Sequence, residues 1–148
     1  LPICSIETEQ DRAALLKLLS KRELPFTVSV EKGANRSLAQ NRVAFLWYKE
    51  IAEQLGDRTA DEVRAYCKLH FGVSIRKAED AVFAEKYDAI FKPLPYEHKL
   101  ALMAEPFDFP VTRGLKTKGM ASYLDAVQKF AAENGIRLTD PELMGMAA

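Results

Sequence analysis

The segment from Asn35 to Arg42 carries the side chains with the clearest chemical meaning in this sequence. Its eight residues contain two Asn-Arg pairs and no acid. Ser37 and Gln40 have the spacing of a capping box, so a helix is expected to begin here. A helix N-terminus favours anions, because its free N–H groups and the positive end of its macrodipole face outward. The pattern therefore predicts a phosphate-binding surface, although the same spacing also fits a simple cap with solvated arginines.

A second basic segment, residues 112–119, repeats this design. Arg113, Lys116 and Lys118 lie on a loop that runs into an amphipathic helix, and two glycines allow its backbone to approach a ligand closely. Thr117 or a neighbour is expected to cap that helix. An ordinary solvated loop would look the same, but two such clusters in one small protein favour a phosphate-binding face.

Charge is sorted along a chain that is neutral as a whole. The 148 residues contain 21 Lys and Arg against 21 Asp and Glu, which argues against a uniformly basic nucleic-acid binder. Residues 32–49 carry a charge of +4 and residues 109–124 a charge of +3, whereas seven acids against three lysines give residues 79–108 a charge of −4. Binding through a few local cations predicts modest affinity and a steep salt dependence.

Length and composition predict one domain over residues 1–148. Cys4 and Cys67 fit neither a metal site nor a disulfide framework and are expected to fill the core in a reducing compartment. No apolar run is long enough for a membrane helix and no secretion signal is recognisable, so the cytoplasm is the expected location.

Hydrophobic periodicity predicts an α+β fold with a small sheet of short strands and several helices. The clearest strand is 26–30, where apolar and hydroxyl side chains alternate. The helix that begins at Ser37 is apolar on more than one face, and its Trp47 and Tyr48 are expected to pack in the core rather than stack on bases. The remaining predicted strands are 3–6 and 107–111, and the remaining predicted helices are 9–19, 59–72, 76–91, 96–103 and 120–134. Thr59 and Glu62 have the spacing of a second capping box, and Gly56, Gly72 and Gly135 are expected to end the helices before them.

Catalytic patterns are the rival explanation for these residues. Glu97-His98-Lys99 has the Glu-x-Lys form of metal-dependent nucleases, for which Asp108 is the nearest further acid. His70 lies on an apolar helical stripe, where a packed histidine is expected rather than a base. The sequence thus predicts no catalytic residue, no metal site and no cofactor.

The signature around residues 35–42, followed by the aromatic-rich helix with Trp47, resembles the NinB family of lambda phage, also called Orf, of recombination mediators. The strand at 28–30, the segment from Thr112 through the helix at 120–134, and Gly135 and Asp140 fit the same order. These parts cover about two thirds of the chain, and residues 76–105 do not align.

The resemblance implies an α+β fold in an intertwined homodimer with a basic cleft for single-stranded DNA and no catalysis. It also implies contacts with the host single-strand binding protein and help in loading a phage recombinase onto DNA. The Asn, Ser and Gln side chains of the signature could instead fix the turn that enters the helix. The alternatives that remain are a Mg²⁺-dependent nuclease or junction-processing enzyme and a protein-interaction module without DNA binding. The predicted nucleic-acid-binding residues are Asn35, Arg36, Asn41, Arg42, Arg113, Lys116 and Lys118.

Overall fold

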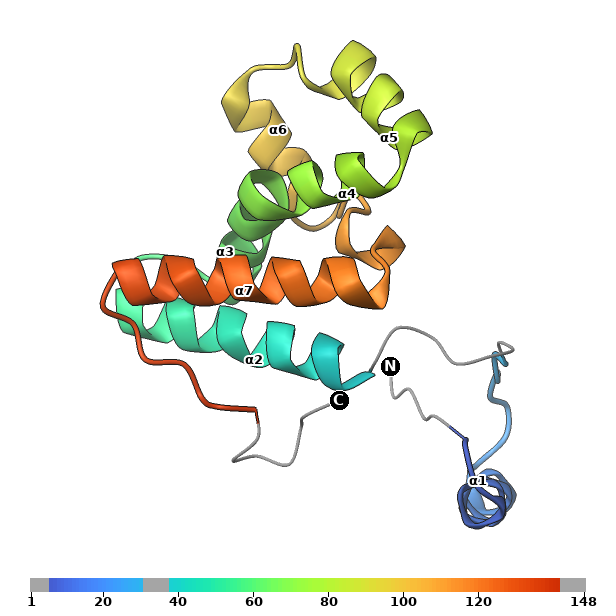
Figure 1. Cartoon of the computed structure of the whole chain (residues 1–148). Coiled ribbons are helices and arrows are strands. Elements are labelled where there is room, and N and C mark those ends of the chain that lie inside the picture. Colours follow the sequence, from blue (N-terminus) through green and yellow to red (C-terminus); the bar gives the residue numbers. More distant parts are fainter. Residues whose placement is uncertain (1–5, 31–37, 142–148) are drawn as a thin grey trace. The chain divides into compact units, whose positions relative to one another are not determined.

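The computed structural model describes residues 6–30 and 38–141 (Figure 1). The chain divides into two units, residues 1–38 and 39–148, which are described separately. Throughout the described residues the regular structure is helical, and no strand is present among them. The prediction of an α+β fold with a small sheet is therefore wrong, whereas the prediction of a single domain stays a prediction.

The first unit contains one regular element, α1 (Glu9–Lys21). Thr8 begins it with a complete capping box, in which Thr8 Oγ1 accepts from the Asp11 N–H at 3.1 Å and Asp11 Oδ2 accepts from the Thr8 N–H at 3.1 Å. These bonds satisfy two N–H groups that a helix start otherwise leaves without partners. The position of this helix agrees with the predicted helix at 9–19.

Two of the predicted strands, 26–30 and 107–111, are not present in the structure. Residues 26–30 have no regular secondary structure, and Val30 is 85% exposed. In the predicted strand 107–111, the alternation is broken because Asp108 has a φ of 47°, a value that a strand residue does not adopt. Most of the predicted strand 3–6 lies outside the described residues. Alternation alone cannot make a strand, because a strand needs a neighbour to bond with its backbone.

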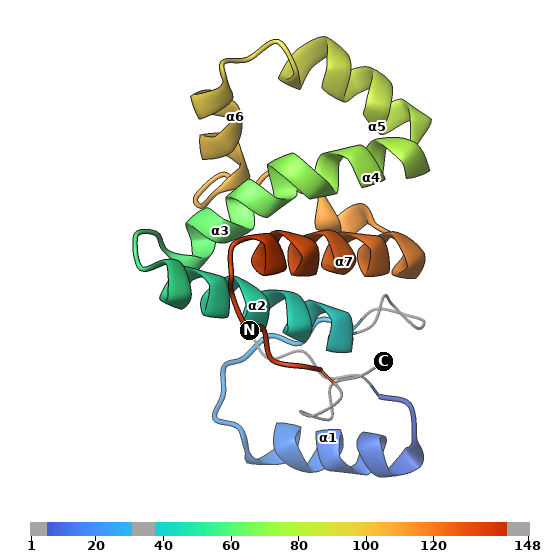
Figure 2. The same cartoon turned by 60° about the vertical axis from the view of Figure 1, so that its left-hand side comes forward.

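In the second unit, α2 (Leu38–Leu55) and α7 (Thr117–Glu133) lie side by side and run in the same direction (Figures 1 and 2). The buried hydroxyls of Tyr48 and Tyr123 join them in the middle, 2.6 Å apart. After α7 the chain returns along α2, where the Trp47 indole N–H donates to the Thr139 carbonyl at 2.9 Å. Trp47 and Tyr48 are both buried, so the prediction that they pack in the core is confirmed.

The helices between α2 and α7 pack over this pair and extend away from it (Figure 2). One buried cluster is shared by α2, α3 and α7, and a second joins α3 and α4 to the segments around Phe91, Met103 and Val111. In chain order these elements are α3 (Ala60–Cys67), the π-helical turn η1 (Lys68–Gly72), α4 (Val73–Glu79), α5 (Ala81–Lys86), the π-helical turn η2 (Tyr87–Phe91), α6 (Tyr96–Met103) and the 3-10 turn η3 (Thr112–Gly114).

Gly72 was predicted to end a helix, but it lies within a helical run from α3 through η1 to α4, with φ −70° and ψ −43°. A Cβ at this position would come within 2.8 Å of Val111 Cγ1 and 3.4 Å of the Tyr123 ring. This glycine is therefore there for close packing rather than for a turn. The predicted helix 76–91 is instead interrupted at Asp80, whose extended backbone and side-chain bond to the Phe83 N–H start α5.

Other predicted helix ends are confirmed. Gly56 and Gly135 follow α2 and α7 with φ values of 77° and 69°, the left-handed conformation that commonly ends a helix. Thr59 and Glu62 form the predicted capping box of α3, with both bonds at 3.1 Å. The predicted capping box at Ser37 lies outside the described residues.

Candidate nucleic-acid interface

The first turns of α2 and α7 meet at one end of the helix pair. Gln40 is buried, and its side-chain Nε2 donates to the Thr117 carbonyl at 3.2 Å. At the other end, Gln54 Nε2 donates to the Arg137 carbonyl at 2.6 Å. Because the helices are parallel, their positive macrodipole ends lie together at the Gln40 end.

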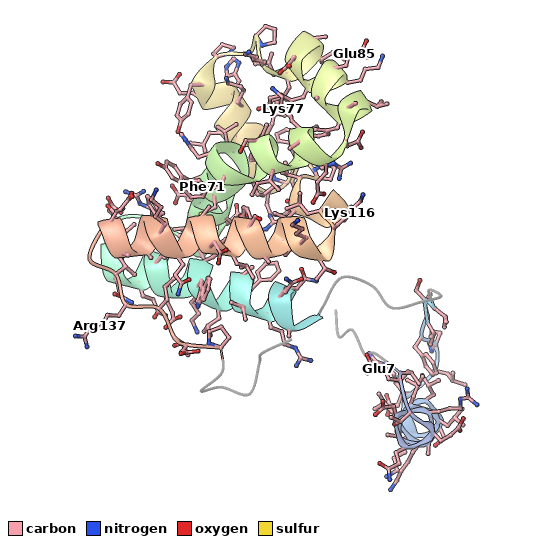
Figure 3. The ribbon with its side chains drawn as sticks, in the orientation of Figure 1. Glu7, Phe71, Lys77, Glu85, Lys116 and Arg137 are labelled. Atoms are coloured by element: carbon pink, nitrogen blue, oxygen red, sulfur yellow. The ribbon has the colours of Figure 1, made fainter. Side chains whose placement is uncertain are left out.

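Four of the predicted cations lie on α2, on α7 or on the turn that leads into α7. Arg42 is in the second turn of α2, Arg113 is in η3, Lys116 is the residue before α7, and Lys118 is in its first turn. All four are exposed, and none forms a salt bridge with any residue that the structure describes. These four residues are called the basic end below. Figure 3 shows Lys116 at this end of α7 and Arg137 beyond the other end.

The remaining predicted binding residues differ in their placement. Asn41 is half-buried near the start of α2, beside the buried Gln40. Asn35 and Arg36 lie outside the described residues. The structure therefore brings the start of α2, which carries Arg42, to the start of α7, but does not place the first Asn-Arg pair.

Glu79 was not predicted to take part in this region, yet it occupies the start of α7. Its Oε2 accepts from the Lys116 main-chain N–H at 3.1 Å, and a Cβ at Gly119 would overlap its Oε1. The expected cap from Thr117 or a neighbour is wrong, since no side chain of the segment caps α7. A carboxylate from α4 thus neutralises part of the positive helix end. The contact spans 37 residues, so no local spacing could have indicated it.

Arg76 is a second missed residue beside the basic end. Its guanidinium lies against the backbone of Gly114, where any Cβ would overlap it, and over the Phe83 ring at 5.0 Å from the centroid. Together with Arg113 it lines a pocket of about 290 Å³. The glycine spacing in the second basic segment was a usable signal, because it indicated close approach to the backbone, but the approaching group is this arginine.

The candidate nuclease residues do not form a cluster of acids. Glu97 and His98 are exposed on α6, whereas Asp108 is held by Arg64 Nη1 at 2.6 Å and by Lys68 Nζ at 2.7 Å. Burial favours the neutral acid at Asp108, but these two hydrogen-bonded cations outweigh it and lower its pKa to about 2. Among the described residues, no group of three or more His, Cys, Asp or Glu side chains is placed to hold a metal ion.

His70 packs against aromatic rings, as the sequence predicts, although the residue as a whole stays exposed. Its ring stacks on Tyr66 with centroids 4.0 Å apart, and its Nε2 lies 2.7 Å from the Tyr96 hydroxyl. Burial lowers the pKa of His70, because the charged ring is disfavoured there. These contacts join α3 and η1 to α6.

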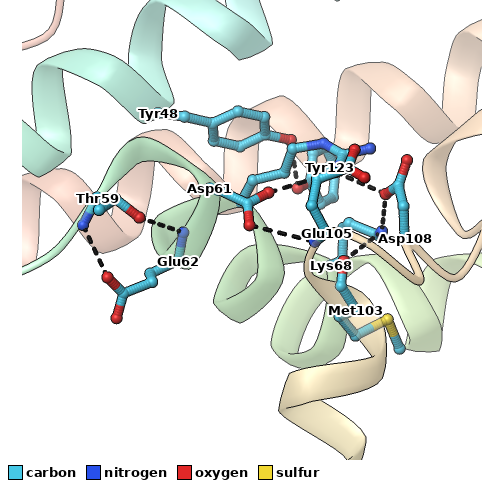
Figure 4. A network of polar contacts seen from close by, with 10 residues as sticks. Tyr48, Thr59, Asp61, Glu62, Lys68, Met103, Glu105, Asp108 and Tyr123 are labelled. Carbon is cyan, nitrogen blue, oxygen red and sulfur yellow. Dashed lines mark hydrogen bonds and ion pairs between the residues drawn. The ribbon is translucent and has the colours of Figure 1, made fainter.

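A partly buried ion network joins α3 and η1 to the loop that contains Asp108 (Figure 4). Lys68 is 1% exposed, and its Nζ donates to the Met103 carbonyl at 2.8 Å as well as to Asp108. Burial lowers the pKa of Lys68. Asp61 accepts from the Glu105 N–H at 3.2 Å at the edge of the same network. The network therefore ties η1 to the loop between α6 and η3.

Cys67 lies at the end of α3 and is completely buried, which confirms its predicted place in the core. Burial raises the pKa of its thiol to about 12. The thiol is therefore held in the protonated, unreactive form. Cys4 lies outside the described residues.

Across residues 6–30 and 38–141, the helices are too short or too polar to cross a bilayer. Comparison of the chain with protein-family models, curated proteins and solved structures gave no match. The resemblance to the NinB family therefore depends on the residues quoted above and stays a prediction.

Proposed function

We propose that this protein binds single-stranded DNA through the basic end. The observation that carries the proposal is the parallel packing of α2 and α7, which brings the starts of two helices far apart in sequence to the same place. Arg42, Arg113, Lys116 and Lys118 are exposed there and form no ion pairs within the described part of the chain. Exposed cations beside positive helix ends are suited to phosphates.

The biological role in this proposal comes from the resemblance. A protein of this kind would act as a recombination accessory factor of a phage or prophage in the bacterial cytoplasm. It would form a homodimer, contact the host single-strand binding protein and help to load a recombinase. No step of this role requires a cofactor or a reaction at the protein. The engagement of Asp108 by Arg64 and Lys68 also disfavours its use as a metal ligand.

The test compares two double variants that remove the same charge. Arg113→Ala with Lys116→Ala changes the basic end, and Lys129→Ala with Arg137→Ala changes the other end of α7 and the segment after it. Binding of a fluorescein-labelled oligo(dT) is measured by anisotropy over a salt series. The first pair is expected to weaken binding and to reduce the logarithmic salt slope by about 1.4, which is about 0.7 for each lost phosphate contact.

The control pair should keep most of the wild-type affinity and slope. Absence of binding by the wild-type protein at low salt, or equal losses in the two pairs, would overturn the proposal. The nuclease alternative is tested with the same labelled strand and Mg²⁺. The strand is expected to stay intact, and cleavage that Glu97→Ala abolishes would contradict the non-catalytic role.

A further inference from the structure

A pocket of about 290 Å³ adjoins the basic end and shares Arg113 with it. It lies between α4, α5 and the segment that leads into α7. Flat side chains and cations share its walls, which are formed by Arg76, Phe83, Phe109, Pro110, Arg113 and Gly114. This volume is at the lower end of the range for small-ligand sites.

Arg76 is held in this pocket but is not fully satisfied. Its Nη2 makes a 3.4 Å contact with Asp80, and its guanidinium lies over the Phe83 ring. Its Nε is buried and has no hydrogen-bond acceptor among the residues that the structure describes. A buried donor without an acceptor is unusual in proteins and marks a site where the packing leaves a polar group unsatisfied.

The side chains that line the pocket indicate which kind of ligand it can bind. The Phe109 ring and the Pro110 ring offer surfaces on which a flat, uncharged ring can lie. Arg113 offers an exposed cation at the same pocket, and it also belongs to the basic end. A nucleotide unit matches both kinds of side chain in this lining, because it has a flat base and an anionic phosphate.

We propose that this pocket is a nucleotide subsite for one unit of the DNA strand bound at the basic end. The base lies against Phe109 and Pro110 beside the Arg76 guanidinium, and Arg113 contacts the adjoining phosphate. This inference rests on the proposed function and adds to it, because phosphate binding alone needs no pocket for a base.

The experiment compares oligo(dT) with an oligomer of the same length that carries abasic sites and keeps every phosphate. Wild-type protein is expected to bind oligo(dT) about 5- to 150-fold more tightly, the range that stacking of one base gives. Phe109→Leu keeps an apolar side chain but removes the flat ring, so this preference should fall close to onefold. Phe107→Leu is the matched control, since Phe107 is 68% exposed and does not line the pocket.

Gly114→Ala supplies a second, independent variant. The added Cβ would overlap the Arg76 guanidinium, which must then move, while every cation is kept. The preference for oligo(dT) should fall here too, even where Phe109→Leu proves too unstable to assay. Lys116→Ala with Lys118→Ala should weaken binding to both oligomers together and leave the preference unchanged.

The outcomes separate the two proposals. If wild-type protein binds neither oligomer, the proposed function fails. If it binds both equally, or if Gly114→Ala keeps the wild-type preference, the subsite is wrong and binding at the basic end still stands.

Discussion

The Gln40 side-chain amide donates to the Thr117 carbonyl across 3.2 Å and links residues that are 77 positions apart in the chain. This bond fixes the start of α2 against the start of α7. Gln54, also on α2, makes the corresponding bond to Arg137 at the far end of the pair. The two glutamines therefore provide matched probes of the two ends.

Gln40→Ala should lower the free energy of unfolding by about 1 to 2 kcal/mol, because it leaves the Thr117 carbonyl without this donor and opens space in a buried site. It should also weaken oligo(dT) binding, since the basic end is less firmly held together. Gln54→Ala is expected to leave binding unchanged. Urea denaturation and fluorescence anisotropy measure the two effects, and equal binding losses in the two variants would contradict the idea that Gln40 organises the interface.

Glu79→Gln should strengthen binding to single-stranded DNA. The substitution removes a negative charge beside the basic end, while the amide oxygen can still accept from the Lys116 N–H. The loss of the favourable charge at the start of α7 should cost at most about 1 kcal/mol of stability. Glu133→Gln removes the same charge at the other end of α7 and should leave the affinity nearly unchanged. Weaker binding in Glu79→Gln would show that its charge is needed to shape the site.

Lys68→Met should lower the free energy of unfolding by about 3 kcal/mol. The substitution keeps the length of the side chain but leaves the buried Met103 carbonyl and one side of Asp108 without their donor. Lys77→Met breaks a pair of similar length, Lys77 Nζ to Asp88 Oδ1 at 2.6 Å, at a much more exposed site. That control should cost less than about 1 kcal/mol. Similar urea midpoints for the two variants would contradict a special role for the buried network.

Asp108 should make the protein sensitive to acid below about pH 4. Its pKa is about 2 in the folded chain and near 3.9 when unfolded, so the unfolded state takes up the proton first as the pH falls. The stabilisation is complete above the unfolded value and is lost as the pH falls through the folded value. Because the carboxylate is partly open to solvent, we expect a loss of about 1 to 2 kcal/mol between about pH 4 and pH 2.

Asp108→Asn is the variant that isolates this effect, since asparagine tolerates the positive φ of the site. Its stability relative to wild type should improve as the pH is lowered through that window. Asp125→Asn, on an exposed position of α7, controls for the change in net charge. Parallel stability curves for wild type and Asp108→Asn would refute the assignment.

Local patterns predicted the helices more reliably than the sheet. The capping box at Thr59, the exits at Gly56 and Gly135 and the apolar stripe of α7 are all set by neighbours within four residues, which the sequence displays directly. The strand at 26–30 was an error of a different kind, because alternation predicts a strand only when a partner exists. Gly72 was misread because its packing against Val111 and Tyr123 involves residues about 40 and 50 positions away.

The same distinction applies to the candidate site. The two basic segments were visible as runs of cations without acids, and the parallel packing of α2 and α7 places their described parts at one end of the pair. Glu79 and Arg76 were missed because both contact the segment from α4. No local sequence spacing predicts a contact between residues so far apart in the chain. The roles of Asn35 and Arg36 stay predictions.

The enclosed thiol of Cys67 gives the molecule a built-in reporter. A side chain with no exposed surface and a pKa near 12 cannot meet an alkylating reagent until α3 separates from α2 and α7. Mass spectrometry of the peptide that contains Cys67, after timed exposure to iodoacetamide, would therefore measure the rate at which the core opens, without any engineered label.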